Sequence, residues 1–196
     1  MSDYYQKNSR QFFDQTVDID SSLFLSSFVQ TIPSQISILD VGCGSGRDLH
    51  WLRKQGFHVT GFERSPGLAS LARNHSGCEV IEGDFATYDF SPHSFDAILA
   101  SGSLVHVPHE NLTTVLENIF QAFNQNPNHA LYMYISLKAG NGVKKDSQNR
   151  IFYLWDDETL KPIFANHELH VIETSKSPSV KNSKDLWIGY ILKKTI

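Results

Sequence analysis

The sequence predicts an α/β protein built on a mostly parallel β-sheet with helices on both faces. Three observations support this fold class. Short apolar segments alternate along the chain with longer segments whose apolar residues recur at helical spacing. A glycine-rich turn connects one of these apolar segments to the helix that follows it. The last two apolar segments have no helix between them, which predicts a hairpin and one antiparallel strand at or near the edge of the sheet.

The chain begins with a polar and aromatic leader, and its first clear helix lies within residues 18–33. Asp20 or Ser21 is expected to cap this helix, and Pro33 ends it. Its apolar residues recur at helical spacing and predict one buried face, formed by Leu25, Phe28, Val29 and Ile32.

The rest of the chain alternates between predicted strands and predicted helices. Strands are expected at residues 37–42, 58–63, 78–84, 94–101, 129–137, 169–176 and 185–194. Helices are expected at residues 47–56, 65–75, 109–123 and 156–167. Right-handed crossovers place such helices on the faces of a parallel sheet, and the loop 177–184 joins the final two strands as a hairpin.

The composition is that of a globular protein with one domain. The chain has 196 residues, of which 40% are hydrophobic and 19% charged, and it contains no internal repeat. A net charge of -4 without a basic cluster argues against broad affinity for nucleic acid. Two cysteines fit a reducing compartment, and no apolar run reaches the ~18 residues that span a membrane. We therefore expect a soluble cytoplasmic protein.

Residues 40–46, DVGCGSG, form the turn after the first strand of the sheet. Gly42, Gly44 and Gly46 permit positive φ and a close approach of the backbone to a ligand, and a tight turn alone needs fewer glycines. Their spacing, G-x-G-x-G, differs from the G-x-G-x-x-G of dinucleotide sites. Asp40 precedes them, and a carboxylate there favours a cationic amino or sulfonium group over an anion.

Acidic residues also end the next two predicted strands. Glu63 can accept hydrogen bonds from both hydroxyls of a ribose, and Asp84 can accept one from the amino group of a base, with Phe85 packed on the ring. Because the carboxyl ends of parallel strands meet at one edge of a sheet, these residues belong to one site. Arg64 would suit the 2′-phosphate of NADP, but the neighbouring Glu63 would repel that phosphate.

These motifs resemble those of the class I S-adenosylmethionine-dependent methyltransferases, in particular the small bacterial type 11 and type 25 methyltransferase domains. The segments that carry the resemblance are ILDVGCGSGRDL, GFERS, EGDF and SFDAILASGSLVHVP. The resemblance implies a Rossmann-like seven-stranded sheet of order 3-2-1-4-5-7-6 with strand 7 antiparallel. It also implies a single methyltransferase domain over residues 1–196, with a helical lid or cap at 1–34 and the core at 35–196.

The resemblance further implies S-adenosylmethionine as the cofactor. The glycine turn and Asp40 would hold its methionine portion, Glu63 its ribose, and Asp84 with Phe85 its adenine. The full set of residues expected at the cofactor is Asp40, Gly42, Cys43, Gly44, Gly46, Glu63, Arg64, Asp84, Phe85 and Ser101. Because the sulfonium group already activates the methyl group, the protein has mainly to align a nucleophile and exclude water, and no metal is expected.

Candidates for the remaining chemistry lie after the fourth strand of the sheet and outside the strands. His106 is a candidate general base, with a structural histidine as the alternative, and His109 is a weaker candidate because it precedes a helix. The aromatic N-terminal segment is expected to form either a lid or a helix that completes the core. Arg150 is expected to bind a carboxylate or phosphate, or else to be solvated. The residues expected at the substrate are Tyr5, Phe13, His106 and Arg150.

The expected function is methylation of an O, N or S atom of a small molecule, without a membrane partner and as a monomer or homodimer. One alternative is a tRNA wobble-uridine side-chain methyltransferase, because such enzymes resemble this motif set. That function needs a positive surface, which residues 138–145 and Arg150 could supply. A cofactor-binding partner subunit without catalytic activity is a third possibility.

Overall fold

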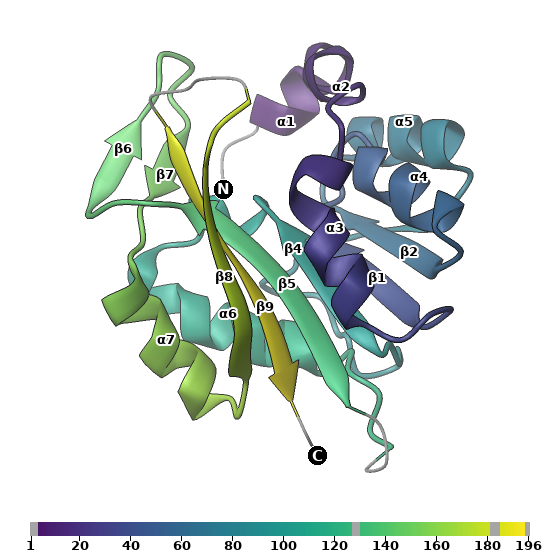
Figure 1. Ribbon diagram of the computed structural model, residues 1–196. Coiled ribbons are helices and arrows are strands. Elements are labelled where there is room, and N and C mark those ends of the chain that lie inside the picture. The colour runs from purple at the N-terminus through teal and green to yellow at the C-terminus, as the bar shows by residue number, and fades with distance from the viewer. Residues whose placement is uncertain (1–3, 127–129, 181–184, 195–196) are drawn as a thin grey trace.

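The computed structural model describes residues 4–126, 130–180 and 185–194. Its centre is a seven-stranded sheet of order β3-β2-β1-β4-β5-β9-β8 (Figure 1). The strands are β1 (Ser37–Val41), β2 (His58–Glu63), β3 (Val80–Glu82), β4 (Ala97–Ser101), β5 (Leu131–Lys138), β8 (His170–Pro178) and β9 (Leu186–Lys194).

The pairing of the strands follows the sequence expectation. The pairs β1–β2, β1–β4, β2–β3 and β4–β5 are parallel, whereas β9 is antiparallel to both β5 and β8. With β8 and β9 counted as the sixth and seventh strands of this sheet, the predicted order and the predicted antiparallel strand are confirmed.

Two further strands form a separate antiparallel ribbon that the sequence patterns did not indicate. They are β6 (Val143–Lys145) and β7 (Ile151–Tyr153). Each has three residues, which is too short for an alternating pattern to be recognised. The ribbon begins after β5 and lies above α7 in Figure 1, near the N-terminal helices.

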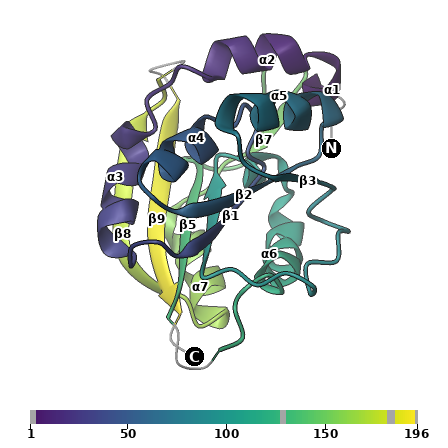
Figure 2. The same cartoon turned by 90° about the vertical axis from the view of Figure 1, so that its right-hand side faces the viewer.

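Helices cover both faces of the sheet (Figure 2). One face carries α3 (Ser22–Thr31), α4 (Arg47–Lys54) and α5 (Pro66–Ser76), and the other carries α6 (Leu112–Phe120) and α7 (Asp157–Asn166). Residues 104–106 and 109–111 form the short 3-10 turns η1 (Leu104–His106) and η2 (His109–Asn111), so α6 begins three residues later than expected. The N-terminal segment forms α1 (Tyr4–Lys7) and α2 (Ser9–Thr16).

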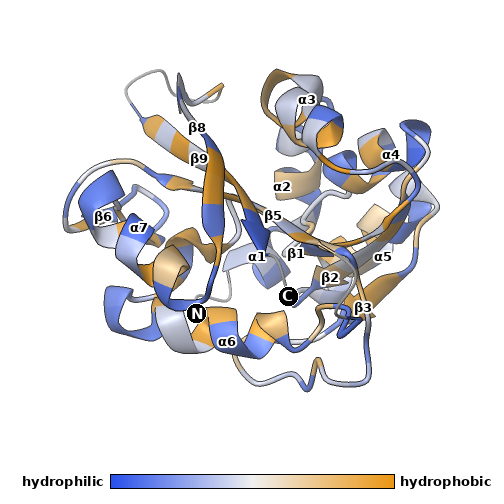
Figure 3. Ribbon diagram, turned by 60° about the horizontal axis from the view of Figure 1, so that its bottom comes forward, coloured by the Kyte–Doolittle hydropathy of each residue, from blue (hydrophilic) through white to orange (hydrophobic). Residues whose placement is uncertain are grey.

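Apolar side chains join each helical layer to the sheet. Leu25 and Phe28 of α3 share a buried cluster with Leu99, which lies on the same face of the sheet. Leu116 of α6 belongs to a larger cluster on the opposite face, together with Ile98. Figure 3 shows hydrophobic residues along β5 and β9, as expected for strands covered on both faces, and hydrophilic residues on α4 and α7.

Local signals explain where several helices begin. Ser65 caps α5 by accepting a hydrogen bond from the Leu68 N–H, and Pro66 follows at the first helical position. At α3, the Oδ1 atom of Asp20 accepts from the Ser22 N–H, whereas the Ser21 hydroxyl donates to Asp48 of α4 instead. Across the described ranges, every helix is too short or too polar to cross a bilayer.

Candidate functional site

The turn between β1 and α4 lies at the carboxyl edge of the sheet, and its glycines are required by the backbone. Gly42, Gly44 and Gly46 have φ of 76°, 56° and 75°. A Cβ atom at Gly42 would lie 2.5 Å from the Cβ of Ser103, and one at Gly46 would lie 2.9 Å from Ala72 of α5. At Gly42 and Gly46 a side chain is therefore excluded because other parts of the protein pack against the backbone.

A cavity of about 320 Å³ opens over this turn. The volume falls within the range of about 300–1,000 Å³ that is usual for small-molecule sites. Residues predicted to contact the cofactor make up much of its lining, namely Gly42, Cys43, Gly44, Glu63, Arg64, Phe85 and Ser101. Three others, Asp40, Gly46 and Asp84, do not line it.

Glu63 joins the glycine turn to the start of α5. Its Oε2 atom accepts from the Gly44 N–H at 3.1 Å, and its Oε1 atom accepts from the Ser65 N–H at 2.8 Å. Burial raises the pKa of the Glu63 carboxyl, and these backbone donors oppose the rise. A carboxylate has about four acceptor positions, so Glu63 can still accept hydrogen bonds from hydroxyl groups of a ligand in the cavity.

Asp40 lies in β1, at the base of the turn, and is 2% exposed. Its Oδ2 atom is buried and has no hydrogen-bond partner among the residues that the structure describes. Burial raises the pKa of Asp40 well above its usual range, repulsion from Asp48 and Glu63 adds to the rise, and Arg47 opposes it. This environment would favour a cationic ligand, because an added positive charge stabilises the ionised carboxylates.

Asp48 is a site residue that the sequence predictions missed. It lies in the first turn of α4, is 5% exposed and lines the cavity. Its Oδ1 atom accepts from the Ser21 hydroxyl at 2.6 Å and from Arg47 Nε at 3.1 Å. The sequence signal that could have identified Asp48 is an acidic residue in the first helical turn after the glycine-rich loop. With Asp40 and Glu63, Asp48 forms a group of three buried carboxylates, which we call the acidic cluster.

Asp84 and Phe85 follow β3. Phe85 is buried and lines the cavity. The Asp84 carboxylate accepts from the Ala86 N–H and lies 3.6 Å from Arg64 Nη1, at the partly exposed rim of the site. The aromatic residue of the predicted adenine site thus faces the cavity, whereas the acidic residue is held beside it.

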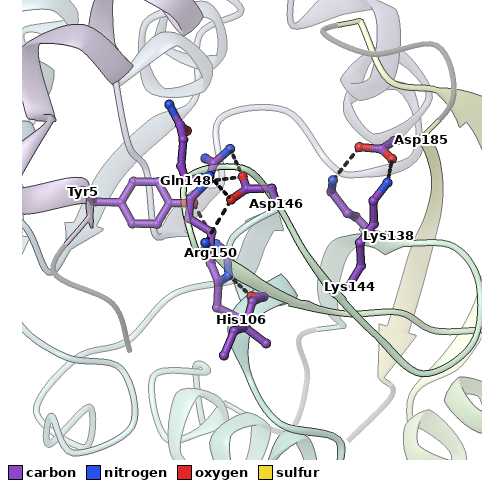
Figure 4. Close-up of polar contacts among 9 residues, drawn as sticks. Tyr5, His106, Lys138, Lys144, Asp146, Gln148, Arg150 and Asp185 are labelled. Carbon is purple, nitrogen blue, oxygen red and sulfur yellow. Dashed lines mark hydrogen bonds and ion pairs between the residues drawn. The ribbon is translucent and has the colours of Figure 1, made fainter.

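His106 and Tyr5 both line the cavity and form a hydrogen-bonded pair (Figure 4). The Tyr5 hydroxyl lies 2.7 Å from His106 Nε2, and His106 Nδ1 contacts the carbonyl oxygen of Ile151 in β7. A carbonyl can only accept, so Nδ1 carries the proton and Nε2 accepts from Tyr5. Burial lowers the pKa of His106 and raises that of Tyr5 to about 12. Both groups are therefore neutral near pH 7.

The remaining predicted substrate residues lie outside this cavity. Phe13 packs against His75 of α5, with 5.9 Å between the ring centroids. Arg150 lines an adjacent cavity, donates to Asp146 at 2.7 Å and lies over the Tyr4 ring. His109 Nε2 contacts the Leu154 carbonyl, which is a structural contact.

The strand order β3-β2-β1-β4-β5-β9-β8 is the Rossmann-like order expected from the resemblance to class I S-adenosylmethionine-dependent methyltransferases. Residues 38–126 match the family model described as a methyltransferase domain. The resemblance that the motifs indicated is thereby confirmed.

Two relatives show how far the sequence similarity extends. A ubiquinone biosynthesis O-methyltransferase of Xylella fastidiosa is 42% identical over 77 residues, which cover 36% of this chain and 31% of the relative. A sterol 24-C-methyltransferase of Gibberella zeae is 30% identical over 112 residues, covering 53% of this chain and 29% of the relative. This chain thus matches less than a third of the length of either relative.

One solved structure matches nearly the whole chain. The 1,6-didemethyltoxoflavin-N1-methyltransferase of Burkholderia thailandensis, crystallised with 1,6-didemethyltoxoflavin and S-adenosylhomocysteine, superposes with a TM-score of 0.74. The alignment covers 98% of this chain and 84% of that chain at 19% identity. At that identity the likeness shows a shared fold.

Proposed function

We propose that this protein is an S-adenosylmethionine-dependent methyltransferase that acts on an O, N or S atom of a small molecule. The observation that carries the proposal is the acidic cluster around the glycine turn, in which Asp40 has a buried oxygen without a partner among the described residues. S-adenosylmethionine has an ammonium group, a sulfonium group and a ribose with two hydroxyls. Those groups would offset the repulsion within the cluster and use its acceptors.

The cavity residues divide naturally among the parts of this cofactor. Residues 42–45 would hold the methionine portion, with Ser101 at its end, and Asp40, which lies behind this lining, would add negative charge. Glu63 would accept from the ribose hydroxyls, and Phe85 would pack against the adenine ring. When bound, the cofactor would supply an electrophilic methyl group, so the chain's own residues have to orient the acceptor and exclude water.

We assign His106 as the general base for acceptors that must lose a proton. Its neutral Nε2 already accepts a hydrogen bond, and its lowered pKa keeps it unprotonated at neutral pH. Tyr5 and His106 both line the cavity, so the Tyr5 hydroxyl could relay a proton, giving its own to Nε2 while it takes one from the acceptor. Because α1 contributes Tyr5, the N-terminal segment would act as a cap over the site.

The basic residues near β6 do not support the tRNA alternative. Lys138 and Lys144 both pair with Asp185, at 2.7 and 2.5 Å, and Arg150 pairs with Asp146. Recognition of a phosphate backbone requires a broad positive surface. The carboxylates of Asp185 and Asp146 reduce the positive charge of the surface that carries these basic residues. The proteins named in the comparisons include enzymes of ubiquinone and sterol metabolism, which favours a small acceptor here as well.

The proposal is tested with methyl-labelled S-adenosylmethionine. The protein is incubated with the labelled cofactor and either a fractionated small-molecule extract or total tRNA, and calorimetry measures binding of S-adenosylhomocysteine in parallel. We expect saturable binding of S-adenosylhomocysteine and label in a small-molecule fraction. Failure to bind it would overturn the cofactor assignment, and label in tRNA would overturn the proposed substrate class.

A further inference from the structure

A second cavity of about 240 Å³ lies directly beside the first. The two cavities share six lining residues: Tyr5, Phe12, Thr16, Arg47, Ser101 and Gly102. A molecule in the second cavity would therefore be separated from one in the first only by this shared boundary. Such a position suits the acceptor of a methyl group, provided that the first cavity holds the cofactor as proposed.

Among the described residues, the charged side chains that line the second cavity are all cations, whereas the first cavity is lined by charges of both signs. Arg47, Lys138 and Arg150 line it, and among the residues that the structure describes no aspartate or glutamate does. In contrast, the first cavity is lined by two carboxylates, Asp48 and Glu63, as well as by two guanidinium groups, Arg47 and Arg64. A ligand with a negative charge would therefore be favoured in the second cavity over the first.

The cations of this cavity are held in place by carboxylates that lie outside its lining (Figure 4). Asp185 pairs with both Lys138 and Lys144, so that group of three carries a net positive charge. An ammonium group has three donors, and Lys138 directs one of them to Asp185. Asp146 orients Arg150 by accepting from its Nε and Nη2 atoms. Lys138 is only 12% exposed, which strengthens its attraction for an anion.

Aromatic side chains form the walls around these cations. Phe24, Tyr134, Phe152 and Trp187 all line the cavity. Lys138 Nζ lies 4.1 Å from the centroid of the Phe152 ring, and the guanidinium carbon of Arg150 lies 5.3 Å from the same centroid. The two charged groups thus lie near one ring, where the anionic end of a flat apolar molecule could reach both of them.

We propose that the second cavity binds the methyl acceptor and that the acceptor is a small aromatic molecule with a carboxylate or comparable anionic group. Lys138 and Arg150 bind the anionic group, and the aromatic walls enclose the ring. The atom to be methylated points to the boundary formed by Tyr5 and Ser101. This inference rests on the proposed function and gives it a substrate class.

The test uses three probes that differ in charge and little in shape: 4-hydroxybenzoate, 4-hydroxybenzamide and 4-hydroxybenzylamine. Each is titrated into the full chain by calorimetry, with and without saturating S-adenosylhomocysteine. We expect the benzoate to bind at least about tenfold more tightly than the amide, because a charge-assisted hydrogen bond is about twice as strong as a neutral one. The benzylamine should bind most weakly.

Two variants and a matched control assign the preference to the cavity. Lys138→Met and Arg150→Met should each remove most of the preference for the benzoate while binding of the amide stays unchanged. Lys145→Met removes an exposed cation of β6 that does not line the cavity, and it should leave the preference intact. Thermal melting confirms that each variant is folded. If Lys138→Met does not fold, the test depends on Arg150→Met alone.

The outcomes separate this inference from the function on which it rests. Binding of S-adenosylhomocysteine without a preference for the benzoate over the amide would overturn the substrate class alone. A preference for the benzoate without any binding of S-adenosylhomocysteine would support an anion site but overturn the methyltransferase proposal. Equal losses for benzoate and amide in both variants would show that the cations act only on the structure, and would also overturn the inference.

Discussion

Replacing Glu63 with Gln removes the negative charge at the end of β2 while keeping the size of the side chain. Both carboxylate oxygens of Glu63 accept backbone hydrogen bonds, one from Gly44 and one from Ser65. The amide of Gln has one acceptor oxygen, so its NH₂ group faces one of these N–H donors. The substitution therefore weakens both the support of the glycine turn and any contact with ribose hydroxyls.

The expected magnitude follows from the charge of the acceptor. A hydrogen bond to a charged group contributes about 1.5–3 kcal/mol, so the loss of one such bond to a ribose hydroxyl corresponds to roughly 10- to 150-fold weaker binding. We expect S-adenosylhomocysteine to bind the Glu63→Gln variant more weakly by this factor. Glu79→Gln removes the charge of an exposed residue just before β3 and should leave the affinity unchanged.

A second ligand pair separates direct contact from distortion of the turn. Calorimetric competition against S-adenosylhomocysteine compares adenosine with 2′,3′-dideoxyadenosine, which lacks both ribose hydroxyls. If Glu63 binds the ribose, the substitution weakens the binding of adenosine by the full factor and changes the binding of dideoxyadenosine very little. An equal loss for both nucleosides would refute the reasoning, because Glu63 would then act only through the position of the glycine turn.

Three further predictions concern the base, the turn and the buried acidic residue. His106→Gln should reduce turnover at least ~100-fold without changing S-adenosylhomocysteine affinity. Because burial lowers the pKa of His106, wild-type turnover should hold at neutral pH and fall only in acidic buffer, where Nε2 becomes protonated. Gly46→Ala should lower the free energy of unfolding by about 2–4 kcal/mol, because the new Cβ atom would be strained at positive φ and would collide with Ala72. Gly56 also has positive φ but has open surroundings, so Gly56→Ala should lower the free energy of unfolding by only about 1 kcal/mol. Asp40→Asn should raise the melting temperature of the ligand-free protein but abolish cofactor binding. A raised folded-state pKa means that ionising Asp40 destabilises the fold as pH rises, so the gain should grow from pH 5 to pH 8.

The sheet could be predicted from the sequence because its signals are local. Apolar runs that end at turns, and helices with one apolar stripe, repeat along residues 37–123 and need no knowledge of distant contacts. The order of the strands was implied by the family resemblance instead, and the structure has the same order. Ribbon β6–β7 was missed because three residues per strand give no pattern and its position depends on contacts such as that between His106 and Ile151.

Several residues that line the first cavity were indicated by the sequence, and their contact with a cofactor stays a prediction, whereas the boundary between the two cavities was not indicated. Gly42 and Glu63 are recognisable because each ends a predicted strand, and Gly44 belongs to the glycine-rich turn that follows Gly42. Asp48 becomes buried through Ser21, which is 27 residues earlier, and Tyr5 reaches His106 across 101 residues. Such pairs depend on the tertiary structure, so the sequence indicated the residue types but left open whether the N-terminal segment caps the site.

The acidic cluster connects the stability of this fold to its proposed function. Three buried carboxylates that repel one another, one with an oxygen lacking a partner among the described residues, make the ligand-free state less stable than neutral side chains would. A fold selected only for stability would not keep that arrangement beside a cavity. The cations of the second cavity, by contrast, each have a carboxylate partner, which is Asp48, Asp146 or Asp185. The empty second cavity therefore lowers the free energy of unfolding only a little. The first site should therefore gain more stability from its ligand than the second, and S-adenosylhomocysteine should raise the melting temperature more than any acceptor does at matched saturation.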